Sequence, residues 1–311
     1  MTKHERIDLY QDVTNRIVEQ LENGVAPWVQ PWSSTASGPS LPLNVTTGRR
    51  YSGINVLLLW GTVQMCGFTS QRWLTFNQAR KVGGSVRKGE KGTTVFYADS
   101  FVPGGKEAEE EARAVQFLKR YTVFNIDQCE HLPEDMTGTV ASLPERETVP
   151  HAEALLQATG ADIRIGGDKA FYAPDPDYIR LPPQNAYFEQ INWYRTAFHE
   201  TAHWSGHKSR LDRDLSGRFG SHKYMAEEIV AELTAAFVLA ELNITPTVRH
   251  ADYIGSWISL LKEDKRAVFT AARLASQAAE YILAFQSNDS CLAAPFSPRK
   301  SHRRVVHRVR L

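Results

Sequence analysis

Cysteine is scarce in this chain of 311 residues, and long apolar runs are absent from it. Its three cysteines, Cys66, Cys129 and Cys291, lie far apart and match no metal-binding spacing. An odd and small number of cysteines argues against a disulfide framework and favours a reducing compartment. The longest apolar patch surrounds residues 57–60 and is too short to cross a bilayer, and the polar first residues do not resemble a targeting peptide. We therefore expect a cytoplasmic protein with no membrane partner.

A strong net charge is also missing, but the charges are unevenly distributed. The formal net charge is +1, and 42% hydrophobic with 23% charged residues are typical of a soluble protein long enough for two domains. Between residues 41 and 98, however, eight lysines and arginines are accompanied by a single acid, Glu90. Six more bases and no acid lie in residues 297–311. Both stretches favour a polyanionic partner.

The most specific motif is His199-Glu200-x-x-His203. Residues four apart lie on one face of an α-helix, so the two imidazoles can converge on one metal ion. Glu200 lies beside them and can reach a metal-bound water without binding the metal itself. Apolar residues at helical spacing predict a packed helix that ends at Ser205-Gly206. Such a motif arises by chance about one time in a hundred in a chain of this length.

A catalytic zinc usually takes three protein ligands, so a third is expected from another element. The helix predicted from Tyr224 to residue 242 has a wide apolar face with Glu228 and Glu232 at its edge, where carboxylates are costly unless they bind a cation or a donor. We predict Glu228 as the third ligand and Glu232 as the acceptor of an imidazole N–H. Four other residues remain alternatives as the third ligand: Glu227, which is less favoured, His207, Asp212 and Asp214.

These residues predict a zinc metallopeptidase of the gluzincin type. Zinc, or another divalent transition metal, lowers the pKa of a bound water, and Glu200 is placed to take its proton during attack on a carbonyl. His207, His222 and Tyr224 are candidates for a second electrophile or proton donor. Two short strands expected at residues 170–174 and 178–182 offer an edge with which a substrate peptide could pair.

The periodicity predicts an α+β protein of two domains. Residues 1–130 form an α+β domain, with helices at residues 7–21, 55–66 and 75–82 and strands at residues 95–102 and 115–126. Residues 131–150, rich in proline, glycine and acids, read as a linker. Residues 151–288 form a mainly helical domain with a small sheet, a helix at residues 152–158, and a helical stretch at residues 253–285 broken near Asp264. Residues 289–311 are expected to be a disordered basic tail.

Aromatic residues are interleaved with the bases of the first domain, a pattern that suits single-stranded nucleic acid. Cations neutralise phosphates, while exposed rings stack on unpaired bases irrespective of sequence. The alternative for each tryptophan is a place in the core, which is the commoner one. The predicted contact residues are Trp28, Trp32, Arg49, Arg50, Tyr51, Trp73, Lys81, Lys88 and Lys91.

Several motifs, in one order along residues 7–285, resemble a known family. In the first half they include Gly24-Val25-Ala26-Pro27-Trp28 and Trp73-Leu74-Thr75-Phe76. In the second half they include His199-Glu200-x-x-His203-Trp204-x-Gly206-His207 and Glu227-Glu228-x-Val230-Ala231-Glu232. Together they resemble the ArdC antirestriction proteins and the related N-terminal region of plasmid TraC primases. The second half is also similar to the ImmA/IrrE regulatory proteases.

The resemblance implies a protein of a mobile element that protects incoming DNA from host restriction during conjugation. Its first domain would bind single-stranded DNA with little sequence preference, and its second would be a zincin-like metallopeptidase domain. A host restriction or regulatory protein is then the expected substrate. Two alternatives stay open: a regulatory metalloprotease that cleaves one specific protein, and a non-enzymatic protein that masks DNA and uses its metal structurally.

Overall fold

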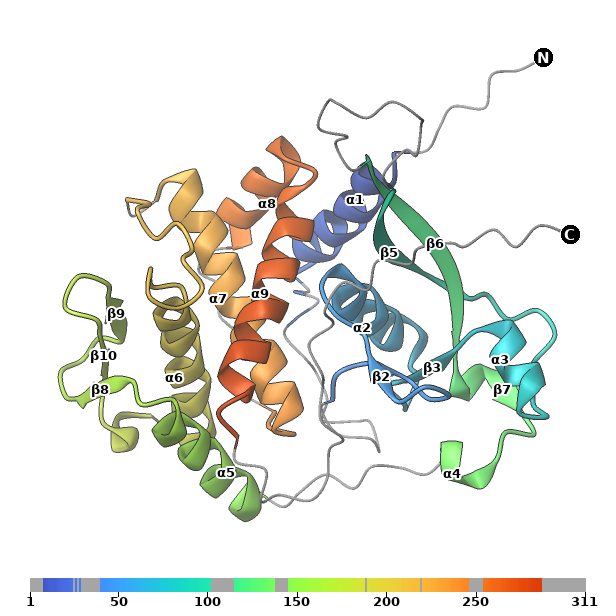
Figure 1. The fold of residues 1–311 in the computed structure, drawn as a ribbon, viewed down its shortest axis with the longest axis horizontal. Helices are drawn as coiled ribbons and strands as arrows, with labels where there is room; N and C mark the ends of the chain where they lie inside the picture. Colours follow the sequence, from blue (N-terminus) through green and yellow to red (C-terminus); the bar gives the residue numbers. More distant parts are fainter. Residues whose placement is uncertain are drawn as a thin grey trace, which may run out of the picture.

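The computed structural model describes residues 8–24, 26, 28, 40–101, 115–137, 145–187, 189–218, 220–245 and 254–286. The architecture is α+β, as predicted (Figure 1). A curved sheet with short helices occupies one side of the molecule, and longer helices with a small sheet occupy the other. No helix among these residues is long and apolar enough to span a membrane.

The first part is built on a five-stranded sheet of order β2-β1-β3-β6-β5. Its strands are β1 Leu43–Asn44, β2 Arg49–Arg50, β3 Arg72–Leu74, β5 Thr93–Phe101 and β6 Val115–Asn125. Beside it lie α1 Leu9–Glu22, α2 Ile54–Cys66, α3 Phe76–Lys81 and a small ladder of β4 Ser85–Val86 with β7 Cys129–Glu130. Helix α3 begins at a capping box, in which the side chains of Thr75 and Gln78 each accept from the backbone N–H of the other.

The second part is mainly helical. Its helices are α5 Glu145–Ala158, α6 Gln190–Ser205, α7 His222–Glu241, α8 Ile254–Glu263 and α9 Ala267–Leu283. Its small sheet has the order β8-β10-β9, with β8 Asp162–Ile165, β9 Phe171–Ala173 and β10 Tyr178–Leu181. Strand β10 pairs in parallel with β8 and antiparallel with β9, so β9 lies at an edge of this sheet.

Most predicted elements lie within two residues of their expected limits, including the break between α8 and α9. Helix α5 is the exception, because it begins at Glu145 rather than at residue 152 and so occupies part of the segment predicted as a linker. Pro150 lies inside this helix. Because proline normally ends a helix, the sequence pattern predicted a later start for α5. Another short helix, α4 Glu134–Thr137, also falls in that segment. The predicted tail, residues 289–311, lies outside the described residues.

One hydrophobic core joins the two parts. Helix α2 is apolar on nearly all sides because it is enclosed: Leu59 packs toward the sheet, while Trp60 contacts Phe237 of α7 with ring centroids 5.6 Å apart. Helix α1 packs on α8, and Trp28 meets Trp257 edge to face at 5.5 Å. The described residues of the two parts therefore share one core.

We predict that Phe237→Ala lowers the free energy of unfolding by about 3–5 kcal/mol, because it leaves a cavity between α2 and α7. Phe237 is 1% exposed. Met65→Ala is the control, since Met65 is 77% exposed and should change stability by less than about 0.5 kcal/mol. Urea unfolding followed by circular dichroism measures both. A cost of Phe237→Ala no larger than that of the control would contradict a shared core.

Candidate metal centre

Helix α6 presents the His-Glu-x-x-His motif from a rigid position. Ala197, Phe198 and Ala202 are fully buried on its inner face. The helix ends at Ser205, as predicted. The next residue, Gly206, leaves room for the Arg213 side chain, because a Cβ at this position would lie 2.9 Å from the guanidinium group. The motif is thus fixed at both its packed face and its C-terminal end.

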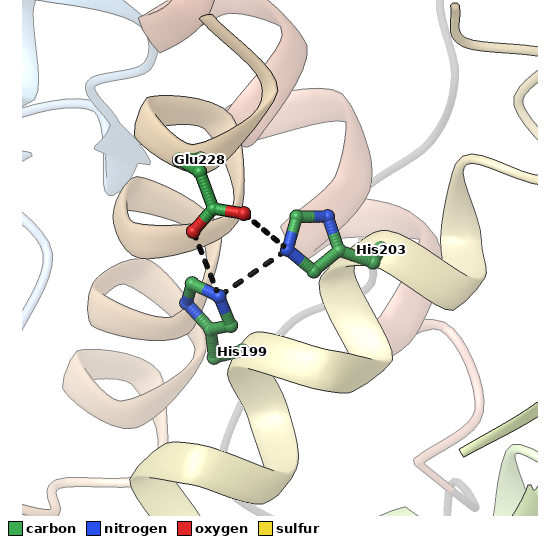
Figure 2. A group of neighbouring side chains, drawn as sticks. All are labelled: His199, His203 and Glu228. Atoms are coloured by element: carbon green, nitrogen blue, oxygen red, sulfur yellow. Dashed lines mark hydrogen bonds and ion pairs between the residues drawn. The ribbon is translucent and has the colours of Figure 1, made fainter. Parts of the chain in front are cut away.

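The two imidazoles converge with Glu228 of α7 in a triangle (Figure 2). The Nε2 atoms of His199 and His203 are 3.2 Å apart. Each Nε2 lies 3.5 Å from one oxygen of the Glu228 carboxylate. Among the residues that the structure describes, these three form the only group of three or more histidines, cysteines or acids with ligand atoms close enough to hold one metal ion.

The spacing of this triangle fits a first-row divalent metal. Ligand atoms about 2.0–2.1 Å from a tetrahedral zinc lie about 3.3–3.4 Å from one another. The two Nε2 atoms are 3.2 Å apart, and each lies 3.5 Å from a different oxygen of Glu228, so the three side chains reach one point with only a small adjustment of the carboxylate. Two imidazole nitrogens and one carboxylate oxygen suit zinc and also suit related divalent ions.

Two further carboxylates hold the imidazoles from behind. Glu232 Oε1 lies 3.4 Å from His199 Nδ1, which is the place predicted for it. Glu227 Oε1 lies 3.3 Å from His203 Nδ1, a role that the sequence analysis missed. An imidazole that donates from Nδ1 to a carboxylate keeps Nε2 free of its proton and aimed at a metal. The centre therefore has one orienting carboxylate for each histidine.

Two buried arginines balance these outer carboxylates and were also missed. Arg195 donates to Glu232 at 2.5 Å, and Arg213 makes two hydrogen bonds to Glu227, at 3.1 and 2.7 Å. Arg195 precedes His199 by four residues, so helical spacing places the two on one face and offered a signal. Arg213 comes from the loop after α6, and nothing in its sequence context points to this contact.

The electrostatics of the centre favour positive charge. Burial opposes protonation of His203, but hydrogen bonds to Glu227 and Glu228 outweigh it and raise the pKa of the imidazole to about 9. Burial likewise opposes ionisation of Glu228, yet the two histidines hold its pKa well below the usual range. Burial raises the pKa of Glu200, which makes it a stronger base than an exposed glutamate.

The triangle opens into a cavity of about 590 Å³. Glu200 lines it and accepts a hydrogen bond from the backbone N–H of Tyr172 in β9. Arg210 fixes this strand beside α6: it contacts both Tyr172 and Asp177 and also donates to the carbonyl of Trp204 at 2.6 Å. The edge strand, the base and the triangle thus share one cavity.

The remaining candidates for a proton donor or a third ligand differ in whether they lie at the cavity. Tyr224 lines the cavity, whereas His222 is largely exposed and pairs with Glu263. His207 contacts Ser209 and does not line the cavity. Asp214 lies at the wall, where Lys223 binds it at 2.8 Å. Neither Asp214 nor Asp212 nor His207 joins the triangle, so Glu228 is the third ligand that the geometry favours.

The predicted DNA-contact residues are not all available. Trp28 and Trp73 are 3% and 0% exposed, so their rings pack in the core and are not stacking platforms, which corrects the prediction. Tyr51 packs partly against the core between α2 and the sheet. Arg50 pairs with Glu241 at the end of α7, so part of its charge is already satisfied. Arg49, Lys81, Lys88 and Lys91 are exposed, and Trp32 lies outside the described residues.

Two family models match the chain. Residues 7–124 match the N-terminal domain of the anti-restriction factor ArdC, and residues 150–274 match a zincin-like metallopeptidase. A solved structure of the antirestriction protein ArdC from plasmid R388, in a metal-free state, is 39% identical, with a TM-score of 0.76 over 90% of this chain and 98% of that one.

The chain belongs to the ArdC antirestriction family. A second ArdC structure from R388, with Mn(II) bound, is also 39% identical, with a TM-score of 0.73 over 91% of this chain and 100% of that one. The uncharacterized protein y4eC of Sinorhizobium fredii is 38% identical over 90% of this chain and 93% of its own length. DNA primase TraC of Escherichia coli is 39% identical over 89% of this chain but only 27% of the primase.

We predict that Glu228→Ala weakens metal binding at least 100-fold, because the substitution removes one of three ligands. Glu232→Gln should weaken it about 10- to 100-fold through the orientation of His199. Asp214→Ala is the matched control, since Asp214 lines the same cavity but pairs with Lys223. Competition against a fluorescent chelator measures each affinity. Full metal retention by Glu228→Ala would overturn the ligand assignment.

Metal affinity should fall as the solution becomes more acidic. A metal must displace the protons that Glu227 and Glu228 stabilise on the imidazoles, and His203 has a pKa of about 9. Below that value the affinity of this ArdC-family centre should drop at least tenfold per pH unit, since at least one proton is released for each metal bound. Chelator competition at pH 6, 7 and 8 tests this, and an affinity independent of pH would contradict it.

Proposed function

We propose that this chain is an antirestriction protein of a mobile element that binds single-stranded DNA without sequence preference and carries an active zinc metallopeptidase centre. The proposed peptidase activity is supported chiefly by the triangle of His199, His203 and Glu228, which is open to a cavity and has Glu200 beside it. Structural zinc sites close the shell with four protein ligands, whereas catalytic sites use three and leave one position open. This arrangement argues against a purely structural metal.

The residues of the cavity have separate chemical roles. A divalent metal bound by the triangle would supply Lewis acidity and lower the pKa of water. Glu200 takes a proton from the attacking water and returns it to the leaving amine, a task for which its raised pKa is suited. Tyr224, which lines the cavity, is the residue best placed to donate a proton to the carbonyl oxygen. Arg195 and Arg213 keep the orienting carboxylates in place.

A peptide is the substrate that the cavity favours. Among the described residues, strand β9 pairs only with β10, and its residues Phe171 and Tyr172 line the cavity. An extended peptide can add to such an edge through backbone hydrogen bonds, which would lay its carbonyl groups across the centre. The expected substrate is a host restriction or regulatory protein.

Support for DNA binding comes from the first part of the chain. Arg49, Lys81, Lys88 and Lys91 are exposed cations in a segment almost without acids. Neutralising phosphates with such cations gives binding that depends on salt and not on sequence. The match to the N-terminal domain of ArdC and the likeness to the TraC primase agree with this assignment.

Glu200→Gln separates the functions that remain open. We predict that it retains metal, folds normally and abolishes peptide cleavage, because it removes the base and leaves the three ligands. The measurements are metal content, cleavage of host proteins by mass spectrometry, and survival of unmodified DNA transferred into a restricting host.

The transfer result decides between mechanisms. Protection lost in Glu200→Gln, with DNA binding intact, supports proteolysis as the route to antirestriction. If Glu200→Gln still protects the DNA and still binds metal, DNA masking is the mechanism of antirestriction. The protease activity then has another role. Cleavage of a single host regulator without any effect on restriction would instead favour the regulatory protease.

A further inference from the structure

We propose that single-stranded DNA lies on a surface formed by α3 and the connection between β4 and β5, with Phe76 as its stacking ring. This inference rests on the proposed DNA binding and assigns it a place. The α3 surface consists of Phe76, Arg80, Lys81, Lys88, Lys91 and Phe124.

The aromatic part of the α3 surface is held in place. Phe76 is 47% exposed, and Phe124 of β6 supports it edge to face with ring centroids 6.5 Å apart. The ring of Phe124 packs closely against the backbone at Gly92. A Cβ at this position would press against the ring and overlap the Thr122 methyl group, so only glycine permits this contact. A ring that is half exposed and fixed from below can stack on a base at little entropic cost.

The charged part lies on α3 and on the connection that leads to Gly92. Arg80 follows Phe76 by four residues and so lies on the same face of α3, and Lys81 is next to it. Lys88 and Lys91 are exposed in the connection that leads to Gly92 and β5. Glu90 is the one acid of this connection, and Arg87 pairs with it at 2.8 Å. Four exposed cations on the two segments that hold Phe76 and support Phe124 suit the repeating phosphates and bases of a single strand.

Two other exposed rings lie on the same sheet but outside the α3 surface. Tyr97 and Tyr121 of β5 and β6 are 49% and 47% exposed, as much as Phe76. They also have an exposed cation nearby, because Lys119 is the register partner of Tyr97 and lies two residues before Tyr121. The two tyrosines are therefore matched controls for an exposed ring beside a cation at a different place on the sheet.

The test is fluorescence anisotropy of a labelled 20-nucleotide dT strand with the full chain over a salt series. Phe76→Ala should weaken binding about 10- to 100-fold, while Phe76→Trp keeps it, because any aromatic ring can stack. Tyr97→Ala and Tyr121→Ala should stay within about twofold of the wild type. Lys88→Ala with Lys91→Ala should reduce the salt slope by about 1.4, since each phosphate contact in a single strand contributes about 0.7.

Two results would overturn the inference in distinguishable ways. In the first, the wild type binds the dT strand, and neither Phe76→Ala nor the double lysine variant weakens that binding, whereas Tyr97→Ala or Tyr121→Ala does. This result rejects the α3 surface and leaves the proposed function standing. No binding of the dT strand by the wild type at any salt concentration rejects the DNA half of the proposed function, and this inference with it. Thermal unfolding of each variant excludes a loss of fold.

Discussion

The metal centre depends on one constraint: the negative charges of the carboxylates buried around its two imidazoles must be balanced. Glu200, Glu228 and Glu232 are 7%, 6% and 5% exposed, and a buried charge without a partner is strongly unfavourable. Arg195 offsets Glu232 and Arg213 offsets the nearby Glu227. Among the described residues, the ion-pair partners of Glu228 are the two histidines, so positive charge is favoured at the point where their Nε2 atoms meet. A divalent cation would supply that charge without requiring either imidazole to be protonated.

Helix α7 carries this constraint into the rest of the fold. In its first half Glu228 completes the triangle, one turn before its end Phe237 packs on Trp60 of α2, and its last residue, Glu241, pairs with Arg50 of β2. One rigid helix therefore contacts the metal centre and the sheet of the first part. The core that the two parts share in this chain is continuous across that contact.

The sequence was informative where a local pattern decides the structure. Helical spacing predicted α6 and α7 and put His199 and His203 on one face, because an i, i+4 repeat and an apolar stripe need no knowledge of the tertiary fold. Glu228 was predicted on a different ground, since a carboxylate at the edge of an apolar face is costly without a cation or a donor. The sequence pattern failed where the answer depends on distant contacts. Burial of Trp28 against Trp257 and the approach of Arg213 to Glu227 join residues that no periodicity relates.

The charge of the cavity also decides which substrate it can accept. Its walls carry Glu200, Glu227, Glu228, Glu232 and Asp214 against the cations Arg195 and Lys223. A divalent cation at the triangle would leave these walls close to neutral, so the cavity offers no cationic surface to a strand of phosphates and does not oppose a neutral peptide backbone. Helix α3, with the exposed Arg80 and Lys81, lies instead on the opposite side of the molecule, far from α6 and β9 (Figure 1). The two proposed activities would therefore use different surfaces, and single-stranded DNA bound at α3 would leave the cavity open to a protein.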